Sequence, residues 1–354
     1  MSDAVNPRAG RGDDADDVVP RRSARPRSAR DAEPGPMPRS QPVRADAPRV
    51  SPQPMSEETP DPDPPLPGWM ASERPATAPA PAATELPVGR NLPMAIAVGV
   101  VLGAVLIGSL FWHPIAFTLV IAVFVVLANV EAAAELRAMG ITVSVPPLLL
   151  GGMAIVFGAY RSGHAGQAVG ILVLFLGTVA WLLADPHRTD VVRNLTLTLM
   201  LGLWTAYLAS FGVLLIGRES DGPVAVLAVA GAAVFGDIGG YAVGVRFGRN
   251  KIAPQVSPNK SVEGLVGGLV VASVLAALVL PQIGDLFTVP TAIAIALVSV
   301  LAGFLGDLTE SMIKRDLGVK DFGRVLPGHG GVLDRVDGLL VALPIGFFAI
   351  TLLT

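Results

Sequence analysis

The chain has 354 residues, no cysteine, a formal net charge of −3 and a mean hydropathy of +0.58. Charged residues make up 16% of it, against about 25% in ordinary soluble domains, which excludes a typical soluble globular protein. The lack of cysteine excludes a disulfide framework, a thiolate nucleophile and a thiolate metal site. A bound metal would therefore need oxygen or nitrogen ligands.

The first 90 residues differ sharply in composition from the rest. They contain 19 of the 31 prolines, 12 of the 26 basic residues and 14 of the 29 acidic residues. So little apolar surface cannot offset the entropy of ordering the chain, and proline removes backbone donors from helices and sheets. We therefore expect residues 1–90 to form a disordered cytoplasmic tail. The arginine-rich stretch 21–30 could contact anionic lipid or a partner, but a solvated tail is the simpler interpretation.

From residue 91 onward, long apolar runs alternate with short polar breaks. Crossing a bilayer takes about 20 mainly apolar residues. The pattern predicts an all-α polytopic membrane domain over residues 91–354, with about nine transmembrane helices. The predicted spans are 92–112, 114–130, 145–160, 167–184, 195–216, 223–245, 264–281, 288–306 and 336–353.

Basic residues predict the orientation of these spans. With nine spans and a cytoplasmic N-terminus, twelve Lys and Arg residues of the membrane domain fall in inner loops, and only Arg161 and Arg218 fall in outer loops. Basic loop residues are retained on the cytoplasmic side. We therefore expect a multi-pass protein of the inner (plasma) membrane, with a cytoplasm-facing polar cavity formed near connections 246–263 and 307–335.

The connection before the last span carries an unusual set of side chains. Four of them, spaced i, i+3, i+4 and i+7, form one polar stripe on a helix that continues an apolar span: Asp307, Glu310, Ser311 and Lys314. Asp334 and Asp337 open the last span and share a helix face. A carboxylate at the end of an apolar helix is costly unless it is paired, hydrated or bound to a metal. Asp307 and Asp334 are therefore candidate ligands of one hard cation, for which Mg²⁺ is the natural choice.

Basic side chains and glycines adjoin these carboxylates. The basic residues suited to phosphate oxygens are Lys314, Arg315, Lys320 and Arg335. Residues 328–331, Gly-His-Gly-Gly, supply a turn where backbone amides can approach a ligand. A carboxylate-bound metal beside basic groups is the chemistry of phosphoryl or nucleotidyl transfer. The alternative is a set of salt bridges with membrane anchors, which explains neither the His-Gly-Gly turn nor the three aspartates.

A second polar region covers residues 237–268. Asp237 lies within an apolar run, where an ionisable residue indicates function. Glycines recur every four residues beside it, which is more typical of close helix packing. Ser257, Lys260 and Ser261 then precede a helix that Ser261 can cap and whose N-terminus favours phosphate, although a simple capped loop is the alternative. No Walker motif is present, and no GxGxxG opens a helix after a strand, which excludes the familiar soluble nucleotide folds.

One further acidic pair is interpreted as structural. Glu131 and Glu135 are spaced i, i+4 and precede Arg137 near the end of a predicted helix. Such spacing brings charges together on a helix surface. We expect a local surface ion pair without a role in the site.

The spacing of the polar residues resembles the signature of phosphatidate cytidylyltransferases, also called CDP-diacylglycerol synthases. The positions that carry the resemblance are Ser311, Lys314, Arg315, Lys320, Asp321, Pro327, His329, Gly330, Gly331, Asp334, Arg335 and Asp337. The segments around Asp237 and at 257–264 resemble the family too, which often has threonine where Ser261 stands. The resemblance covers about residues 92–354 and is most secure over a catalytic half at about 235–340.

The resemblance implies an enzyme of phospholipid biosynthesis that converts CTP and phosphatidic acid to CDP-diacylglycerol and pyrophosphate with Mg²⁺. It implies Asp307 and Asp334 as metal ligands, and Lys314, Asp337 and Asp237 as further catalytic residues. The implied substrate-binding residues are Ser257, Lys260, Ser261, Arg315, Lys320, Asp321, His329, Gly330, Gly331 and Arg335. It leaves open a second cation and a homodimer, and no nucleic acid partner is expected.

Two other functions would also place charged residues in a membrane domain. A CTP-using polyprenol kinase would share the basic clusters, but it transfers the γ-phosphate to a hydroxyl, and the complete signature argues against it. A transporter or channel would need polar residues along a path that reaches both faces of the membrane. Here the polar residues gather near one face.

Overall fold

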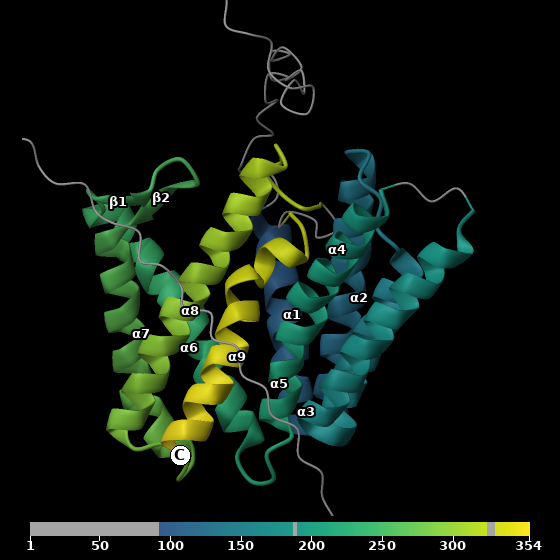
Figure 1. The fold of residues 1–354 in the computed structure, drawn as a ribbon. Coiled ribbons are helices and arrows are strands. Elements are labelled where there is room, and N and C mark those ends of the chain that lie inside the picture. The colour runs from purple at the N-terminus through teal and green to yellow at the C-terminus, as the bar shows by residue number, and fades with distance from the viewer. Residues whose placement is uncertain (1–91, 187–189, 324–329) are drawn as a thin grey trace, which may run out of the picture. The chain divides into compact units, whose positions relative to one another are not determined.

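The computed structural model describes residues 92–186, 190–323 and 330–354 (Figure 1). The predicted tail, residues 1–90, and the candidate substrate-binding residue His329 lie outside these described residues. Within the described part, nearly all regular structure is helical.

Nine α-helices lie in this described part, together with a π-helical segment (η1, Leu203–Tyr207) and a 3-10 turn (η2, Leu333–Arg335). The helices are α1 (Leu92–Trp112), α2 (Pro114–Ala138), α3 (Val145–Ala184), α4 (Val191–Gly202), α5 (Leu208–Ile216), α6 (Gly222–Phe247), α7 (Val262–Ile283), α8 (Val289–Asp316) and α9 (Asp337–Leu353). α4, η1 and α5 together match the predicted span 195–216, and α3 covers two predicted spans. The other helices agree with the predicted spans to within a few residues, except that α2 and α8 run further. The extension of α8 carries the polar stripe, as the sequence predicted.

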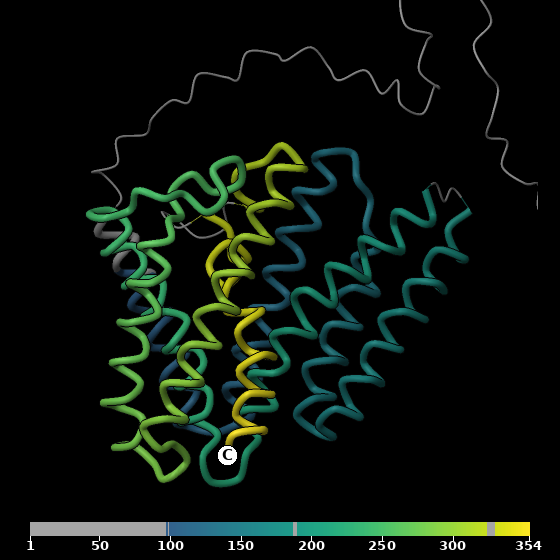
Figure 2. Tube along the Cα trace, turned by 60° about the vertical axis from the view of Figure 1, so that its left-hand side comes forward, coloured from purple at the N-terminus to yellow at the C-terminus, as the bar shows by residue number. Residues whose placement is uncertain are grey.

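The predicted spans 145–160 and 167–184 both lie in α3, which reverses direction at its middle. Ser162 and Gly163 have non-helical backbone angles, and Gly163 has a φ of +59°. A Cβ on Gly158 would overlap the carbonyl of Gly166, so the two halves are in backbone contact on either side of the turn. The trace in Figure 2 shows α3 turning back on itself. α3 is therefore an antiparallel helical hairpin.

Six helical stretches in the described part are long and apolar enough to cross a membrane. They are α2, α3, the continuous stretch Val191–Ile216, α6, α7 and α8. The chain is therefore a multi-pass membrane protein. The predicted count of nine adds α1, α9 and the second half of α3 to these six, and it stays a prediction.

The all-helical prediction is wrong for one short segment between α6 and α7. Strands β1 (Lys251–Ala253) and β2 (Ser257–Ser261) pair antiparallel, with Lys251 opposite Ser261 and Ala253 opposite Ser257. The turn is closed by a 3.1 Å hydrogen bond that the Val256 amide donates to the Ala253 carbonyl. Strands this short leave no readable alternation in the sequence.

Close helix packing positions the end of the bundle that carries the hairpin. α6 packs along α7, and α8 packs against both of them and against α9. A Cβ on Gly268 of α7 would overlap the Gly236 carbonyl of α6, and a Cβ on Gly306 of α8 would lie 2.7 Å from the Asp337 carbonyl oxygen. Glycine at these crossings lets the backbones approach. Gly236 belongs to the four-residue glycine pattern, so the close packing predicted from that pattern is confirmed for α6. The α8–α9 crossing brings the start of α9 beside Asp307.

Candidate functional site

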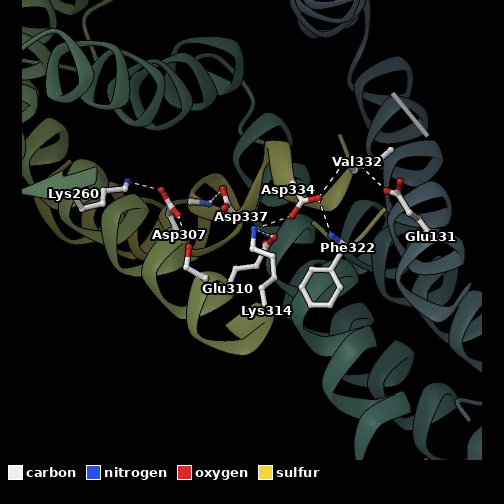
Figure 3. Close-up of polar contacts among 12 residues, drawn as sticks. Glu131, Lys260, Asp307, Glu310, Lys314, Phe322, Val332, Asp334 and Asp337 are labelled. Atoms are coloured by element: carbon white, nitrogen blue, oxygen red, sulfur yellow. Dashed lines mark hydrogen bonds and ion pairs between the residues drawn. The ribbon is translucent and has the colours of Figure 1, made fainter. Parts of the chain in front are cut away.

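Polar side chains from β2, α8 and the start of α9 meet at the end of the bundle that carries the hairpin (Figure 3). Lys260 Nζ of β2 forms an ion pair with Asp307 Oδ2 of α8, and Ser311 Oγ donates to Asp307 Oδ1 at 3.2 Å. Lys260 Nζ also lies 5.1 Å from the centroid of the Phe304 ring, a cation–π contact. Asp307 is thus bound on both oxygens by side chains that the sequence placed in the site.

Hydrogen bonds around the hairpin hold Lys260 in this position. Ser261 caps α7, because its Oγ accepts from the Gly264 amide at 3.1 Å. Glu263 in the first turn of α7 accepts from the backbone amides of Arg249 and Asn250 at 3.1–3.2 Å. The cap predicted for Ser261 is confirmed, and these bonds fix the end of β2 next to which Lys260 lies.

A polar cavity of about 280 Å³ lies beside the Lys260–Asp307 pair. Asp237 of α6 lines it together with Lys260 and Asp307. Other lining residues supply hydroxyl, amide and aromatic groups: Ser257, Asn259, Ser261, Tyr241 and Phe304. The cavity therefore offers both a cation and hydrogen-bonding groups to an anionic ligand.

A second cluster centres on Asp334 of η2, whose side chain is 3% exposed. Its Oδ1 accepts from Lys314 Nζ at 2.8 Å, and its Oδ2 accepts from the amides of Phe322 and Gly331 at 3.0 and 3.2 Å. Lys314 also donates to Glu310 Oε1 at 3.1 Å. Asp334 thus connects α8 to Phe322 and Gly331, two residues of the connection between α8 and α9.

Asp337 lies between these two clusters in Figure 3. Its carboxylate accepts from the Gly338 amide at 2.7 Å, and it interacts electrostatically with Asp307, Asp237 and Lys314. Asp237 in turn interacts with Lys260 and Asp307. Asp237 and Asp307 are therefore close to Lys260, while Asp337 links this group to Lys314.

The two predicted metal ligands have different partners in the structure. Asp307 is bound to Lys260, whereas Asp334 is bound to Lys314 and to backbone amides. In the described ranges no group of three or more His, Cys, Asp or Glu residues is arranged to hold a metal ion. The assignment of Asp307 and Asp334 as joint ligands stays a prediction.

Glu131 does not lie on the surface, where the sequence predicted it; it is 5% exposed and contacts the connection between α8 and α9. Its Oε2 accepts from the Val332 amide at 2.5 Å, and a Cβ on Gly323 would overlap its carboxylate. A Cβ on Gly331 would lie 3.2 Å from Glu131 Oε2 and 2.5 Å from Asp334 Oδ2. Glu131 and Asp334 therefore flank the same loop. The signal was present in the sequence, because Glu131 lies in an apolar helix, as Asp237 does.

Replacing Glu131 with alanine is expected to lower turnover by about tenfold or more, because the Val332 amide loses its buried acceptor and the loop loosens. Glu131→Gln keeps an acceptor oxygen and should recover most of the rate. The measurement is kcat and KM, determined separately for both variants and compared with the values of the unsubstituted protein. Equal losses in alanine and glutamine would contradict a positioning role for the acceptor.

The remaining predicted residues are distributed around these clusters. Arg315 Nε donates to the Val256 carbonyl at 3.3 Å and so joins α8 to the hairpin turn. Gly330, with a φ of +81°, has Arg335 Nη2 and Asp321 Oδ1 within 4 Å of where a Cβ would stand. Lys320 is exposed. Thus Asp321, Gly330 and Arg335 come together, while Arg315 has a structural contact that the sequence did not predict.

Comparisons with known proteins give a consistent result. A model of the cytidylyltransferase family matches residues 93–353. The chain is 36% identical over 310 residues to a phosphatidate cytidylyltransferase of Mycobacterium leprae, covering 81% of this chain and 95% of that protein. It is 36% identical over 304 residues to that of Mycobacterium tuberculosis strain H37Rv, covering 79% and 90%. A Haemophilus influenzae phosphatidate cytidylyltransferase is 48% identical over 113 residues, 30% of this chain and 39% of that protein.

Proposed function

The chain belongs to the cytidylyltransferase family, and from this premise we propose that it transfers CMP from CTP to phosphatidic acid, giving CDP-diacylglycerol and pyrophosphate. The observation that carries the proposal is the polar cavity with its Lys260–Asp307 pair at the end of apolar helices. A nucleotide phosphate bound in this cavity would lie at about the same depth in the membrane as the headgroup of a lipid, so the two could react.

The polar cavity suits the triphosphate of CTP. Lys260 supplies a positive charge, Ser257 a hydroxyl and Asn259 an amide, all from β2. The N-terminus of α7, which begins directly after β2, adds the positive end of a helix dipole. Lys260 would therefore bind the triphosphate, while Lys314, held by Glu310 and Asp334, would face the lipid phosphate.

The excess of carboxylates in this site supports the proposal that it uses Mg²⁺, for which Asp307 and Asp334 would have to exchange their lysine partners for the ion. Asp237, Asp307 and Asp337 outnumber the two lysines that interact with them, Lys260 and Lys314, and carboxylate oxygens are the ligands that Mg²⁺ prefers. Asp307 would hold the ion, with Asp334 as the second ligand proposed from the sequence. Bound Mg²⁺ supplies Lewis-acid charge neutralisation of the phosphates.

The reaction is an in-line displacement. A phosphate oxygen of phosphatidic acid forms a bond to the α-phosphorus of CTP while the bond from that phosphorus to the pyrophosphate oxygen breaks. The attacking oxygen is already anionic near neutral pH, so the site needs no strong general base. Lysine positioning and charge neutralisation are the main contributions of the protein.

We also propose that the N-terminus and the polar cavity face the cytoplasm at the inner membrane. The asymmetry of basic residues supports this orientation, with twelve on the proposed inner side and two on the outer side. CTP would then reach the cavity from the cytoplasm.

The proposal is tested with purified protein in nanodiscs, supplied with CTP, Mg²⁺ and phosphatidic acid. We expect pyrophosphate release that requires phosphatidic acid and equals the liponucleotide formed. A polyprenol alcohol in its place should support no reaction. Phosphorylation of the alcohol without pyrophosphate release would show a kinase instead.

A further inference from the structure

A second and larger cavity, of about 590 Å³, lies among α2, α4, η1 and α8 and the connection that follows α8. Its lining is mainly apolar and includes Leu136, Leu197, Trp204, Ile313, Leu317 and Phe322. The volume falls within the range of ligand pockets, about 300–1,000 Å³. Ser257, Asn259 and Lys260, which are proposed to bind CTP in the polar cavity, do not line this apolar cavity.

α8 contributes to both cavities through different residues. Asp307 lines the polar cavity, whereas Glu310, three residues further along, lines the apolar cavity with Ile313 and Leu317. Glu310 is also the partner of Lys314, and the lining residue Phe322 donates its amide to Asp334. The apolar cavity thus adjoins the Lys314–Asp334 cluster through Glu310 and Phe322, so a ligand lying in it would end beside that cluster.

The apolar cavity also borders the outer surface of the spanning helices. Its lining residues Met200 and Met312 are 43% and 52% exposed, and both lie on stretches long and apolar enough to cross the membrane. The charged side chains of Arg193 and Asp316 line it as well. An apolar space that opens beside exposed methionines at one side and lies near Arg193 and the Lys314–Asp334 cluster at the other suits a lipid, with its chain inside and its phosphate toward the cationic groups Arg193 and Lys314.

We propose that this apolar cavity holds one acyl chain of the acceptor lipid during nucleotidyl transfer. The proposal rests on the proposed function, because it assigns a place to part of that substrate. A chain leaving the bilayer gains little from the hydrophobic effect, since lipid tails are as apolar as the cavity. The cavity therefore acts through fit, holding the chain so that the phosphate is oriented for attack.

Two substitutions that change the cavity volume in opposite directions test this assignment. Leu197→Trp fills the cavity, and Trp204→Ala enlarges it; neither residue belongs to the catalytic or nucleotide-binding groups. The matched control is Val192→Trp, on the same helix but 78% exposed and outside the cavity lining. Turnover is measured with dihexanoyl and dioleoyl phosphatidic acid for each protein, and the ratio of the two kcat/KM values is compared.

We expect Leu197→Trp to lower the dioleoyl-to-dihexanoyl ratio about tenfold or more, because the long chain loses its space while the short one fits. Trp204→Ala should shift the ratio toward bulkier chains, and Val192→Trp should leave it unchanged. Trp204→Ala carries the test alone if Leu197→Trp does not fold. An unchanged ratio in both cavity variants, as expected if ordinary bilayer lipid fills the space, would overturn the assignment. If the unsubstituted protein converts neither lipid, the proposed function itself fails.

Discussion

Replacing Asp334 with asparagine is expected to reduce turnover by at least about a hundredfold. The substitution removes the negative charge that holds Lys314 Nζ at 2.8 Å and presents an amide where an anionic oxygen stood. Lys314 then loses its fixed place beside the lipid phosphate, and the proposed metal loses a ligand. The rate is measured as CDP-diacylglycerol formed per enzyme at saturating CTP and phosphatidic acid.

A matched control separates this effect from unfolding. Asp285→Asn makes the same chemical change at an exposed residue between α7 and α8, and it should retain normal turnover. Far-ultraviolet circular dichroism should show the same helix content in both variants. Near-normal turnover in a folded Asp334→Asn protein would remove Asp334 from the site.

Replacing Lys260 with alanine is expected to lower kcat/KM for CTP by about 10² to 10³-fold. The ammonium is the positive charge that pairs with Asp307 in the polar cavity, so its removal leaves an acidic cavity that repels a triphosphate. Lys260→Arg keeps the charge with a different donor geometry and should recover part of the loss. The measurement is initial rate against CTP concentration at fixed phosphatidic acid.

Lys251→Ala provides the control within the same hairpin. Lys251 lies on β1, is exposed and is not among the residues that line the polar cavity. Its loss should change kcat/KM for CTP less than about twofold. Similar losses for Lys251→Ala and Lys260→Ala would indicate that only the general charge of the hairpin matters.

The helices were predictable from the sequence, because the length of each apolar run corresponds to the length of one helical span. The break at Ser162–Gly163 separated two spans in the sequence, and the structure folds them back at that point. The polar stripe from Asp307 to Lys314 follows from helical spacing alone, which a continuous α8 confirms. Local periodicity therefore accounts for most of the fold.

The pairing of charges was not predictable in the same way. Spacing placed Asp307 and Asp334 near each other, but it could not determine that Lys260 would bind the first and Lys314 the second. Glu131 reaches Val332 across 201 positions of sequence, a contact made by the packing of α2 against the rest of the bundle. Such contacts depend on tertiary arrangement, which no local pattern encodes.

The most direct test of nucleotidyl transfer follows each phosphate of CTP through the reaction. The protein is supplied with phosphatidic acid, Mg²⁺ and CTP labelled at the α-phosphate or, separately, at the γ-phosphate. We expect α-label in an organic-soluble lipid and γ-label in pyrophosphate, with both products lost in Asp334→Asn. Appearance of γ-label in the lipid fraction, or of α-label only in free CMP, would contradict it.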